Sequence, residues 1–291
     1  IKYNLVDYTN ERKIQKRSLV RIGGLAIFLG YIIGLSTIYF TGNLENIRFN
    51  GISLYGSTLL LTSAAIFVLG ICDDLIQLSP KFRLLFQFII AGFTWTQGLR
   101  IDEIDITLIS SRFEILVLPN YISLLITVIW VVAIINAINW MDGLDGLAPG
   151  LVIISSLAYF LIEYSNNIFS ISFILISLLG TAIAFLFYNY NPAKILMGDG
   201  GSYFFGYNLA ILSFLSSSGS SAYLKLHIPF LIMFVPILDM IYVIFRRIIT
   251  GKKPFNADKT HIHHRLINSG LNERQSVRYI LSIALITATL A

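Results

Sequence analysis

The strongest constraint on this chain is its series of long apolar runs. Nine runs are candidates for membrane spans, each of which needs about 20 mostly apolar residues. They cover residues 22–41, 54–72, 84–98, 120–139, 146–163, 168–187, 203–217, 228–248 and 276–291. Backbone groups must be hydrogen-bonded inside a membrane, and continuous apolar runs indicate helices rather than the alternating strands of a barrel. The sequence therefore predicts an all-α, polytopic integral membrane protein with about nine transmembrane helices.

Composition excludes a soluble enzyme. Charged residues make up only 13% of the 291 residues and hydrophobic residues 56%, whereas soluble proteins have about 25% charged residues. A single cysteine excludes an internal disulfide framework and a multi-cysteine metal site.

The basic residues are distributed unevenly between the predicted loops. If all nine runs span the membrane, one side receives residues 1–21, 73–83, 140–145, 188–202 and 249–275. With Arg246, Arg247 and Arg278, which lie at the adjoining ends of two runs, this side carries 17 of the 21 Lys and Arg residues, and the other side carries Arg48, Arg100, Arg112 and Lys225. Positively charged loops face the cytoplasm, so this side is predicted to be cytoplasmic, and the net charge of +5 gives no reason to expect nucleic acid.

The chain reads as one domain. We find no repeat and no linker, and therefore expect a single transmembrane domain over residues 1–291. Because the chain begins with Ile1 and stops inside an apolar run, we expect sequence to be missing at both ends. The predicted external segment 99–119 alternates in polarity and is expected to form a short hairpin.

Carboxylates gather at the predicted cytoplasmic ends of the helices. Asp73 and Asp74 end the second run, Asp142 and Asp145 follow the fourth, and Asp199 precedes the seventh. Acidic residues at a membrane boundary are costly and mark functional sites, although one alone could equally cap a helix or solvate a loop. Five in three loops on one side favour a site. Carboxylate and amide oxygens suit Mg²⁺, which commonly also binds substrate phosphates.

A basic counterpart follows in the last predicted cytoplasmic loop. It contains Lys252, Lys253, Lys259, His261, His263, His264 and Arg265. For Lys252 and Lys253 topology alone is a sufficient explanation, whereas the clustered histidines favour phosphate binding. Zinc is an alternative for clustered histidines, but Asp and Lys neighbours suit Mg²⁺ better. Lys81 and Arg83 could bind an anionic lipid head group or simply mark the cytoplasmic side.

These residues predict a phosphate-binding site at the cytoplasmic face that contains a metal ion and basic side chains. They lie in motifs that resemble those of a known family. In chain order the motifs are Asn10-Glu-Arg-Lys, Arg21-Ile-Gly-Gly-Leu-Ala, Asp73-Asp74, Leu78-Ser-Pro-Lys-Phe-Arg-Leu-Leu, Asn136-Ala-Ile-Asn-Trp-Met-Asp-Gly-Leu-Asp-Gly-Leu-Ala, Asn191-Pro-Ala-Lys-Ile-Leu-Met-Gly-Asp-Gly-Gly-Ser, Pro236-Ile-Leu-Asp and Asp258-Lys-Thr-His-Ile-His-His-Arg-Leu. Together they resemble the polyprenyl-phosphate N-acetylhexosamine-1-phosphate transferases over nearly the whole chain.

The resemblance implies a Mg²⁺-dependent phosphoglycosyltransferase, with Mn²⁺ as a substitute metal, in the bacterial plasma membrane and with its active site facing the cytoplasm. It implies transfer of a sugar 1-phosphate from a UDP-N-acetylhexosamine to undecaprenyl phosphate, with release of UMP. Asp199 and Asn139 would bind Mg²⁺, and the catalytic carboxylates would be Asp73, Asp74, Asp142 and Asp145. The implied substrate-binding residues are Lys81, Asn136, His261, His263, His264 and Arg265. Family members have ten or eleven spans.

Alternatives remain for the donor and for the class of protein. Gln77 after the aspartate pair and Ile262 within the histidine run resemble the branch that uses UDP-GlcNAc and initiates cell-envelope glycan synthesis. The alternative donor is UDP-MurNAc-pentapeptide, and a homodimer is one option for the oligomeric state. An ion-coupled transporter is the alternative of a different class, but only Asp239 lies well inside a predicted span.

Overall fold

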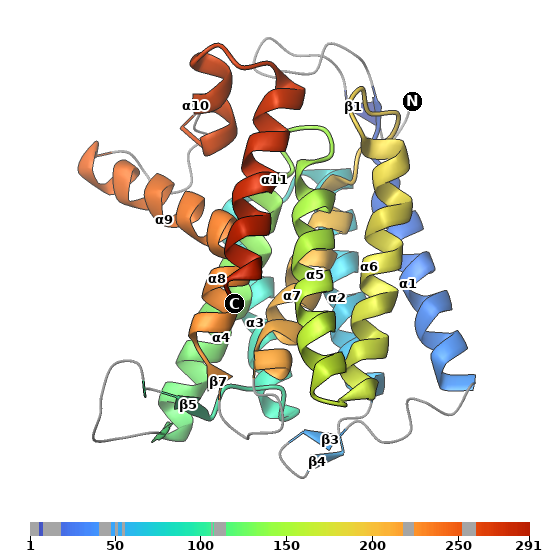
Figure 1. Ribbon diagram of the computed structural model, residues 1–291, viewed down its shortest axis with the longest axis vertical. Coiled ribbons are helices and arrows are strands. Elements are labelled where there is room, and N and C mark those ends of the chain that lie inside the picture. Colours follow the sequence, from blue (N-terminus) through green and yellow to red (C-terminus); the bar gives the residue numbers. More distant parts are fainter. Residues whose placement is uncertain are drawn as a thin grey trace.

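The computed structural model describes residues 6–7, 19–40, 48–49, 52–53, 56–105, 107, 115–217, 224–251 and 260–291. Its helices are α1 (Gly23–Phe40), α2 (Gly56–Ile76), α3 (Pro80–Thr96), α4 (Asn120–Met141), α5 (Leu147–Ser165), α6 (Phe169–Asn189), α7 (Gly198–Ser217), α8 (His227–Ile232), α9 (Phe234–Ile249), α10 (Ile262–Asn268) and α11 (Glu273–Thr289). Figure 1 shows these helices as a bundle, which confirms the predicted helical class.

The long helices fall where the apolar runs predict them, with one exception, and the short helix α10 lies within the predicted loop 249–275. Five of the described helices, α1, α2, α4, α5 and α6, are long and apolar enough to cross a membrane. The run 228–248 was predicted as one helix, and this is wrong, because α8 ends at Ile232 and α9 begins at Phe234. Pro236 has no N–H to donate to the carbonyl of Ile232, so an unbroken helix would lose a hydrogen bond there. After this break α9 runs outward from the bundle (Figure 1).

Short strands connect the helices. They are β1 (Val6–Asp7), β2 (Leu19–Val20), β3 (Arg48–Phe49), β4 (Ile52–Ser53), β5 (Glu103–Asp105), β6 (Ile115–Val117) and β7 (Leu224–Lys225). The predicted hairpin in 99–119 is confirmed, since β5 pairs antiparallel with β6 with Ile104 opposite Leu116. On its other edge β5 pairs parallel with β7. The antiparallel pairs β1–β2 and β3–β4 were not predicted.

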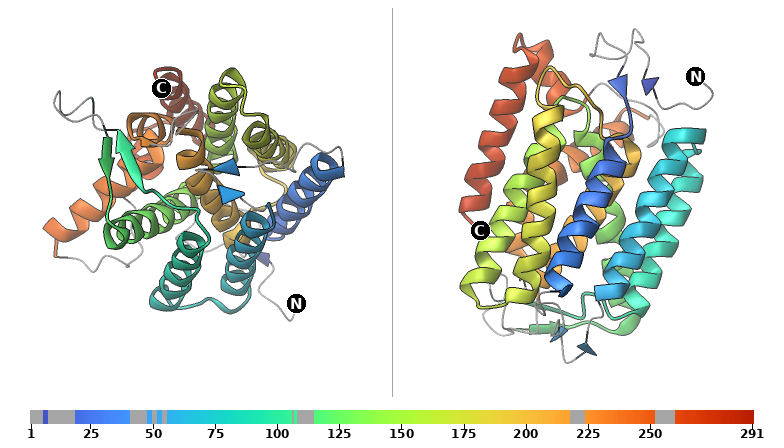
Figure 2. Two further views of the ribbon diagram at one scale, coloured as in Figure 1. Left: turned by 90° about the horizontal axis from the view of Figure 1, so that it is seen from below. Right: turned by 90° about the vertical axis from the view of Figure 1, so that its right-hand side faces the viewer.

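Helix α7 is the centre of the bundle. All its side chains from Gly200 to Ser216 are buried, and the other helices surround it in Figure 2. Glycines let two neighbours approach its backbone. A Cβ at Gly70 of α2 would lie 2.5 Å from the carbonyl oxygen of Asp199, and a Cβ at Gly24 of α1 would lie 2.5 Å from the backbone nitrogen of Gly201. The first turn of α7 is therefore held tightly between α1 and α2.

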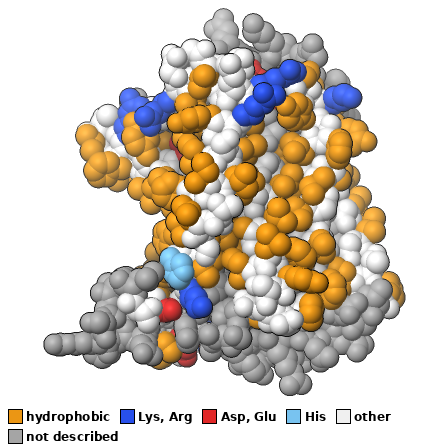
Figure 3. Space-filling model, in the orientation of Figure 1, with side chains coloured by type: hydrophobic (Ala, Val, Ile, Leu, Met, Phe, Trp, Pro, Cys, Tyr) orange, Lys and Arg blue, Asp and Glu red, His pale blue; other side chains and the backbone are white. Residues whose placement is uncertain are grey.

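The surface of the bundle is apolar along its sides. Figure 3 shows hydrophobic side chains over the flank, with several Lys and Arg side chains near the end that carries α10. Large residues such as Phe187 are 78% exposed, as expected for side chains that face lipid. The turn between α2 and α3, the α4–α5 loop, the start of α7 and helix α10 all lie at this one end, while β5 and β7 lie at the opposite end (Figure 1).

Candidate active site

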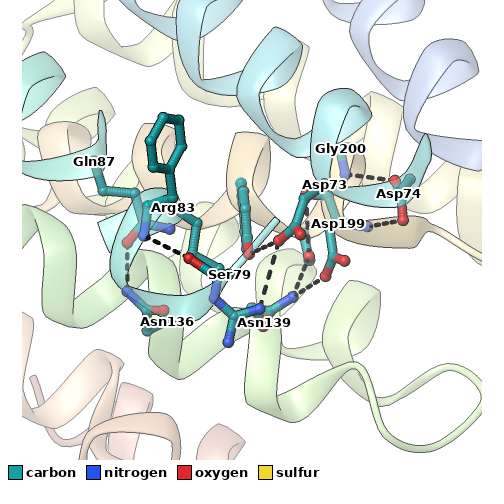
Figure 4. Close-up of polar contacts among 12 residues, drawn as sticks. Asp73, Asp74, Ser79, Arg83, Gln87, Asn136, Asn139, Asp199 and Gly200 are labelled. Atoms are coloured by element: carbon teal, nitrogen blue, oxygen red, sulfur yellow. Dashed lines mark hydrogen bonds and ion pairs between the residues drawn. The ribbon is translucent and has the colours of Figure 1, made fainter. Parts of the chain in front are cut away.

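The start of α7 is capped by a carboxylate from α2. Asp74 accepts hydrogen bonds from the backbone nitrogens of Asp199 at 2.9 Å and Gly200 at 3.0 Å (Figure 4). A helix N-terminus favours a negative charge, because its N–H groups are unpaired and its dipole is positive there. Gly198 has a φ of +72°, and a Cβ at this position would lie 2.6 Å from Oδ2 of Asp74. The glycines of this segment therefore serve the Asp74 cap, and these two N–H groups are not free to bind a phosphate.

Asp73, the neighbour of Asp74, is buried and held from two sides. Its Oδ2 accepts from the hydroxyl of Tyr203 on α7 at 2.7 Å and from Nη1 of Arg83 on α3 at 3.4 Å. On the other side of the pair, Nη1 of Arg21 lies 3.7 Å from Oδ1 of Asp74. Two guanidinium groups therefore border the carboxylates, each partly exposed, which gives this cluster both charges that a phosphate and its counter-ion require.

Asp199 meets Asn139 from α4. Nδ2 of Asn139 donates to Oδ1 of Asp199 at 2.7 Å and to Oγ of Ser202 at 2.9 Å (Figure 4). The described residues contain no group of three or more His, Cys, Asp or Glu arranged to hold a metal ion. The carboxylate of Asp199 nevertheless suits Mg²⁺, which takes few protein ligands and fills its shell with water and substrate phosphates. Asn139 would add its amide oxygen if the amide turned over, because its nitrogen faces Asp199 here. We call Asp73, Asp74, Asn139 and Asp199 the carboxylate cluster.

Asp142 and Asp145 lie in a turn, because α4 ends at Met141 and α5 begins at Leu147. Burial raises the pKa of Asp142 well above its ordinary value; Arg21 opposes this shift, and the nearby charges of Asp199 and Asp74 add to it. Asp142 is thus electrostatically part of the carboxylate cluster. Asp145 faces another way, where its Oδ2 accepts from the backbone nitrogen of Ala193 and from Asn191.

The histidines form a second cluster around α10. Nδ1 of His261 donates to Oδ2 of Asp239 on α9 at 2.7 Å, and the backbone nitrogen of Ile262 donates to Oδ1 at 2.7 Å. Since a carboxylate only accepts, His261 carries its proton on Nδ1 and leaves Nε2 for another partner. The rings of His261 and His263 are parallel, with centroids 5.6 Å apart, and the ring of His264 lies 4.4 Å from that of His263. We call these three residues the histidine cluster.

The two clusters meet at the end of α4. The ring of Trp140, next to Asn139, lies 5.3 Å from that of His261. A Cβ at Gly143 would lie 2.6 Å from Nε2 of His263, so His263 packs directly on the α4–α5 loop. Arg247 of α9 also contacts Trp140, because its guanidinium carbon lies 5.3 Å from the centre of the Trp140 ring. Residues predicted from separate motifs are thus brought to one end of the bundle.

Other predicted residues lie at the edge of this arrangement. Asn136 donates to Oε1 of buried Gln87 at 2.7 Å, about one turn of α4 away from Asn139 (Figure 4). Lys81 is exposed in the first turn of α3. Arg265 places its guanidinium carbon 4.7 Å from the centre of the Tyr242 ring on α9. Lys252, Lys253 and Lys259 lie outside the residues that the structure describes.

Two residues of the site were not predicted. Arg21 begins one of the motifs and directly precedes an apolar run, so its position could have suggested a role beside the carboxylates. Tyr203 lies inside an apolar run and gave no signal, since its contact with Asp73 joins residues 130 positions apart.

Comparison with known proteins shows the family to which the chain belongs. The model of glycosyl transferase family 4 matches residues 57–217, more than half of the chain. A probable undecaprenyl-phosphate N-acetylglucosaminyl 1-phosphate transferase of Bacillus subtilis is 39% identical over 98% of this chain and 76% of its own length. The decaprenyl-phosphate N-acetylglucosaminephosphotransferase of Mycobacterium leprae is 32% identical, over 94% of this chain and 73% of its own length. An undecaprenyl-phosphate alpha-N-acetylglucosaminyl 1-phosphate transferase of Salmonella typhi is 28% identical, over 99% and 76%. The chain belongs to glycosyl transferase family 4.

Proposed function

We propose that this protein transfers N-acetylglucosamine 1-phosphate from UDP-GlcNAc to undecaprenyl phosphate, giving undecaprenyl-diphospho-GlcNAc and UMP. The observation that carries the proposal is the 39% identity, over 98% of the chain, to the Bacillus subtilis protein of that printed name. The site supports it, because a lipid-facing bundle carries a charged cluster at one end. A lipid acceptor and a water-soluble donor can meet there.

In the proposed reaction an oxygen of the lipid phosphate attacks the phosphorus that carries the sugar. A new P–O bond forms, the bond to the bridging oxygen of the donor diphosphate breaks, and UMP leaves with that oxygen. Such transfers depend chiefly on alignment and charge neutralisation. Arg21 and Arg83 would neutralise phosphate oxygens, because each borders the carboxylate cluster and is partly exposed.

Asp199 is the proposed Mg²⁺ ligand, with the amide oxygen of Asn139 as a second ligand. Mg²⁺ would supply charge neutralisation at the donor diphosphate when bound. Asp74 would position Asp199 by capping its helix, and Asp73 would hold Arg83 and Tyr203 in place. Asp142, whose pKa is raised, is placed to hold or accept a proton near the donor. The guanidinium of Arg265 would bind the donor phosphates, and Nε2 of His261 would accept a hydrogen bond from a hydroxyl of the donor.

We further propose that the nine apolar runs cross the bacterial plasma membrane, the eighth of them as the two helices α8 and α9, and that the site faces the cytoplasm. The support is the charge asymmetry of the loops, together with the gathering of these loops at one end of the bundle (Figure 1). A cytoplasmic site is also where a nucleotide-sugar donor is available.

The decisive experiment is an assay of the purified protein with undecaprenyl phosphate and UDP-GlcNAc. We expect release of UMP and a lipid product of the mass of undecaprenyl-diphospho-GlcNAc, with Mg²⁺ required and EDTA inhibitory. Mn²⁺ should restore part of the activity. Absence of any lipid product with UDP-GlcNAc and with UDP-MurNAc-pentapeptide would reject the transferase, and ion flux in liposomes would favour a transporter instead.

A further inference from the structure

Asn191, in the loop between α6 and α7, joins three segments through one side-chain amide. Its Nδ2 donates to Oδ2 of Asp145 at 3.2 Å and to Oε2 of Glu273 at 2.8 Å. Its Oδ1 accepts from Nε of Arg274 at 3.0 Å. Both N–H donors and the oxygen of the amide are therefore engaged. Glu273 and Arg274 are the first two residues of α11, so the amide connects α11 to two loops of the site.

The two loops are themselves bonded to each other. Besides Asn191, Asp145 accepts from the backbone nitrogen of Ala193 at 2.9 Å. The backbone nitrogen of Gly146 donates to Oδ1 of Asn189, whose Nδ2 donates to the carbonyl of Ile195. The α4–α5 loop and the segment before α7 thus form one unit, which leads directly to Asp199.

Helix α10 is held at its two ends by different contacts. At its start, Asp239 binds His261 and Ile262. At its end, a short connection leads into α11, with the backbone nitrogen of Leu271 donating to the carbonyl of Leu266. An open pocket of about 470 Å³ lies at this corner, lined by Asn191, Ile267, Leu271, Asn272, Glu273 and Arg274. The polar contacts of Asn191 therefore add to the apolar packing of α10 and α11 in fixing the corner.

We propose that Asn191 is a positioning residue for the transfer reaction. Through Asp145 on one side and Glu273 and Arg274 on the other, it sets the place of α10, and hence of the histidine cluster, relative to the carboxylate cluster. Without this link the end of α10 next to α11 would lose part of its support, while its start would stay held by Asp239 and by the packing of His263 on Gly143. The expected change in kinetics rests on the proposed function. The expected change in the position of α10 rests on the contacts alone.

The substitution Asn191→Asp tests the link without changing the size of the side chain. A carboxylate has no hydrogen to donate, so both bonds from Nδ2 are replaced by repulsion from Asp145 and Glu273. The second change Glu273→Gln removes one of these charges and supplies an N–H donor, and should rescue the first. Asn272→Asp is the matched control, because it adds the same charge to the same pocket while Asp remains a good N-cap for α11.

Kinetics give the first readout. If the histidine cluster binds the donor equally in the ground and transition states, its displacement raises KM for the donor and leaves kcat nearly unchanged. We expect KM for UDP-GlcNAc to rise about tenfold in N191D, to return to within about threefold of wild type in N191D/E273Q, and to stay unchanged in N272D. KM for undecaprenyl phosphate should not move in any of them. A fall in kcat alone, or no rescue, would overturn the proposal.

Hydrogen exchange of the substrate-free protein gives the second readout and needs no activity. Peptides covering α10 should exchange about tenfold faster in N191D and normally in N272D, while peptides from α7 stay protected. If N191D does not fold, the double change Glu273→Ala and Arg274→Ala cuts both bonds from Asn191 to α11, leaves its bond to Asp145, and should still loosen α10. Unchanged exchange of α10 in the folded variants would overturn the inference, even if transfer is confirmed. Faster exchange of α10 in an enzyme that transfers nothing would reject the proposed function and leave the structural link standing.

Discussion

Asp199 is the residue whose surroundings most closely match those of a metal ligand. It lies at the start of α7, next to Asn139 and beside Asp73 and Asp74. The change Asp199→Asn keeps its size and removes the charge that would hold Mg²⁺. We expect transfer to fall by about 100-fold or more, equivalent to about 3 kcal/mol of transition-state stabilisation. Near-normal Mg²⁺-dependent turnover would exclude this role. Asp105→Asn, an exposed carboxylate at the opposite end, is the control and should leave the rate unchanged.

His263 makes the stability of the folded protein depend on pH. Burial, together with the charges of His264 and His261, lowers the pKa of His263 from 6.5 to about 3. Below about pH 6.5 the unfolded chain binds a proton that the folded chain does not, so this residue's contribution to stability is full above that pH and is lost as the pH falls toward 3. Between pH 7.5 and 5.5 we expect a larger drop in Tm for wild type than for His263→Gln, measured in detergent. Equal drops in Tm would show that His263 does not carry this dependence.

At the scale of helices, the contact between α2 and α7 sets the carboxylate cluster. A Cβ at Gly70 would lie 2.5 Å from the carbonyl oxygen of Asp199 and 2.6 Å from Cα of Gly200, both backbone atoms that cannot turn aside. Gly70→Ala should therefore push the helices apart, cost about 1–3 kcal/mol and displace Asp199. We expect a lower Tm and a lower rate. Gly92→Ala on α3 is the control, since its Cβ would meet nothing within 4 Å. A Gly70→Ala protein as stable and active as the control would contradict this packing argument.

The sequence predicts elements better than it predicts their contacts, and the reasons are physical. Apolar runs locate the helices because each span must be apolar along the thickness of the membrane. The break at Met233 depends on a single residue, Pro236, within an otherwise apolar run. Asp74 was predicted from its place at a span end. That it caps α7 could not be predicted, because the contact joins residues 125 positions apart. The contact between Asp145 and Asn191 could not be predicted for the same reason, because these residues are 46 positions apart.

At the scale of the whole molecule, the charge asymmetry predicts its orientation. Ser269 lies at the α10 end and Thr107 at the opposite end, and both are exposed. After Cys72→Ser, single cysteines at these positions can be labelled in intact bacteria with a maleimide that does not cross membranes. We expect Thr107→Cys to react in intact cells and Ser269→Cys only after permeabilisation. The reverse pattern would place the site outside and remove its access to a cytoplasmic donor.

Donor choice is a property of the assembled site, because it depends on the space left around both clusters. A pocket for UDP-GlcNAc need not accommodate a lactyl-peptide arm, whereas a pocket for UDP-MurNAc-pentapeptide must leave a path for it. Gln77, in the turn between α2 and α3 at a φ of +51°, and Ile262, whose nitrogen is bound to Asp239, are the residues that resemble the GlcNAc branch.

Sites discriminate when the wrong partner clashes or leaves polar groups unpaired. We therefore expect kcat/KM for UDP-GlcNAc to exceed that for UDP-MurNAc-pentapeptide by at least about 100-fold, or about 2.7 kcal/mol. The measurement is a competition between the two donors for undecaprenyl phosphate, with the lipid products separated by mass. A dominant MurNAc-pentapeptide product would reverse the choice of donor and leave the reaction type in place, because the carboxylate cluster acts on the diphosphate that both donors share.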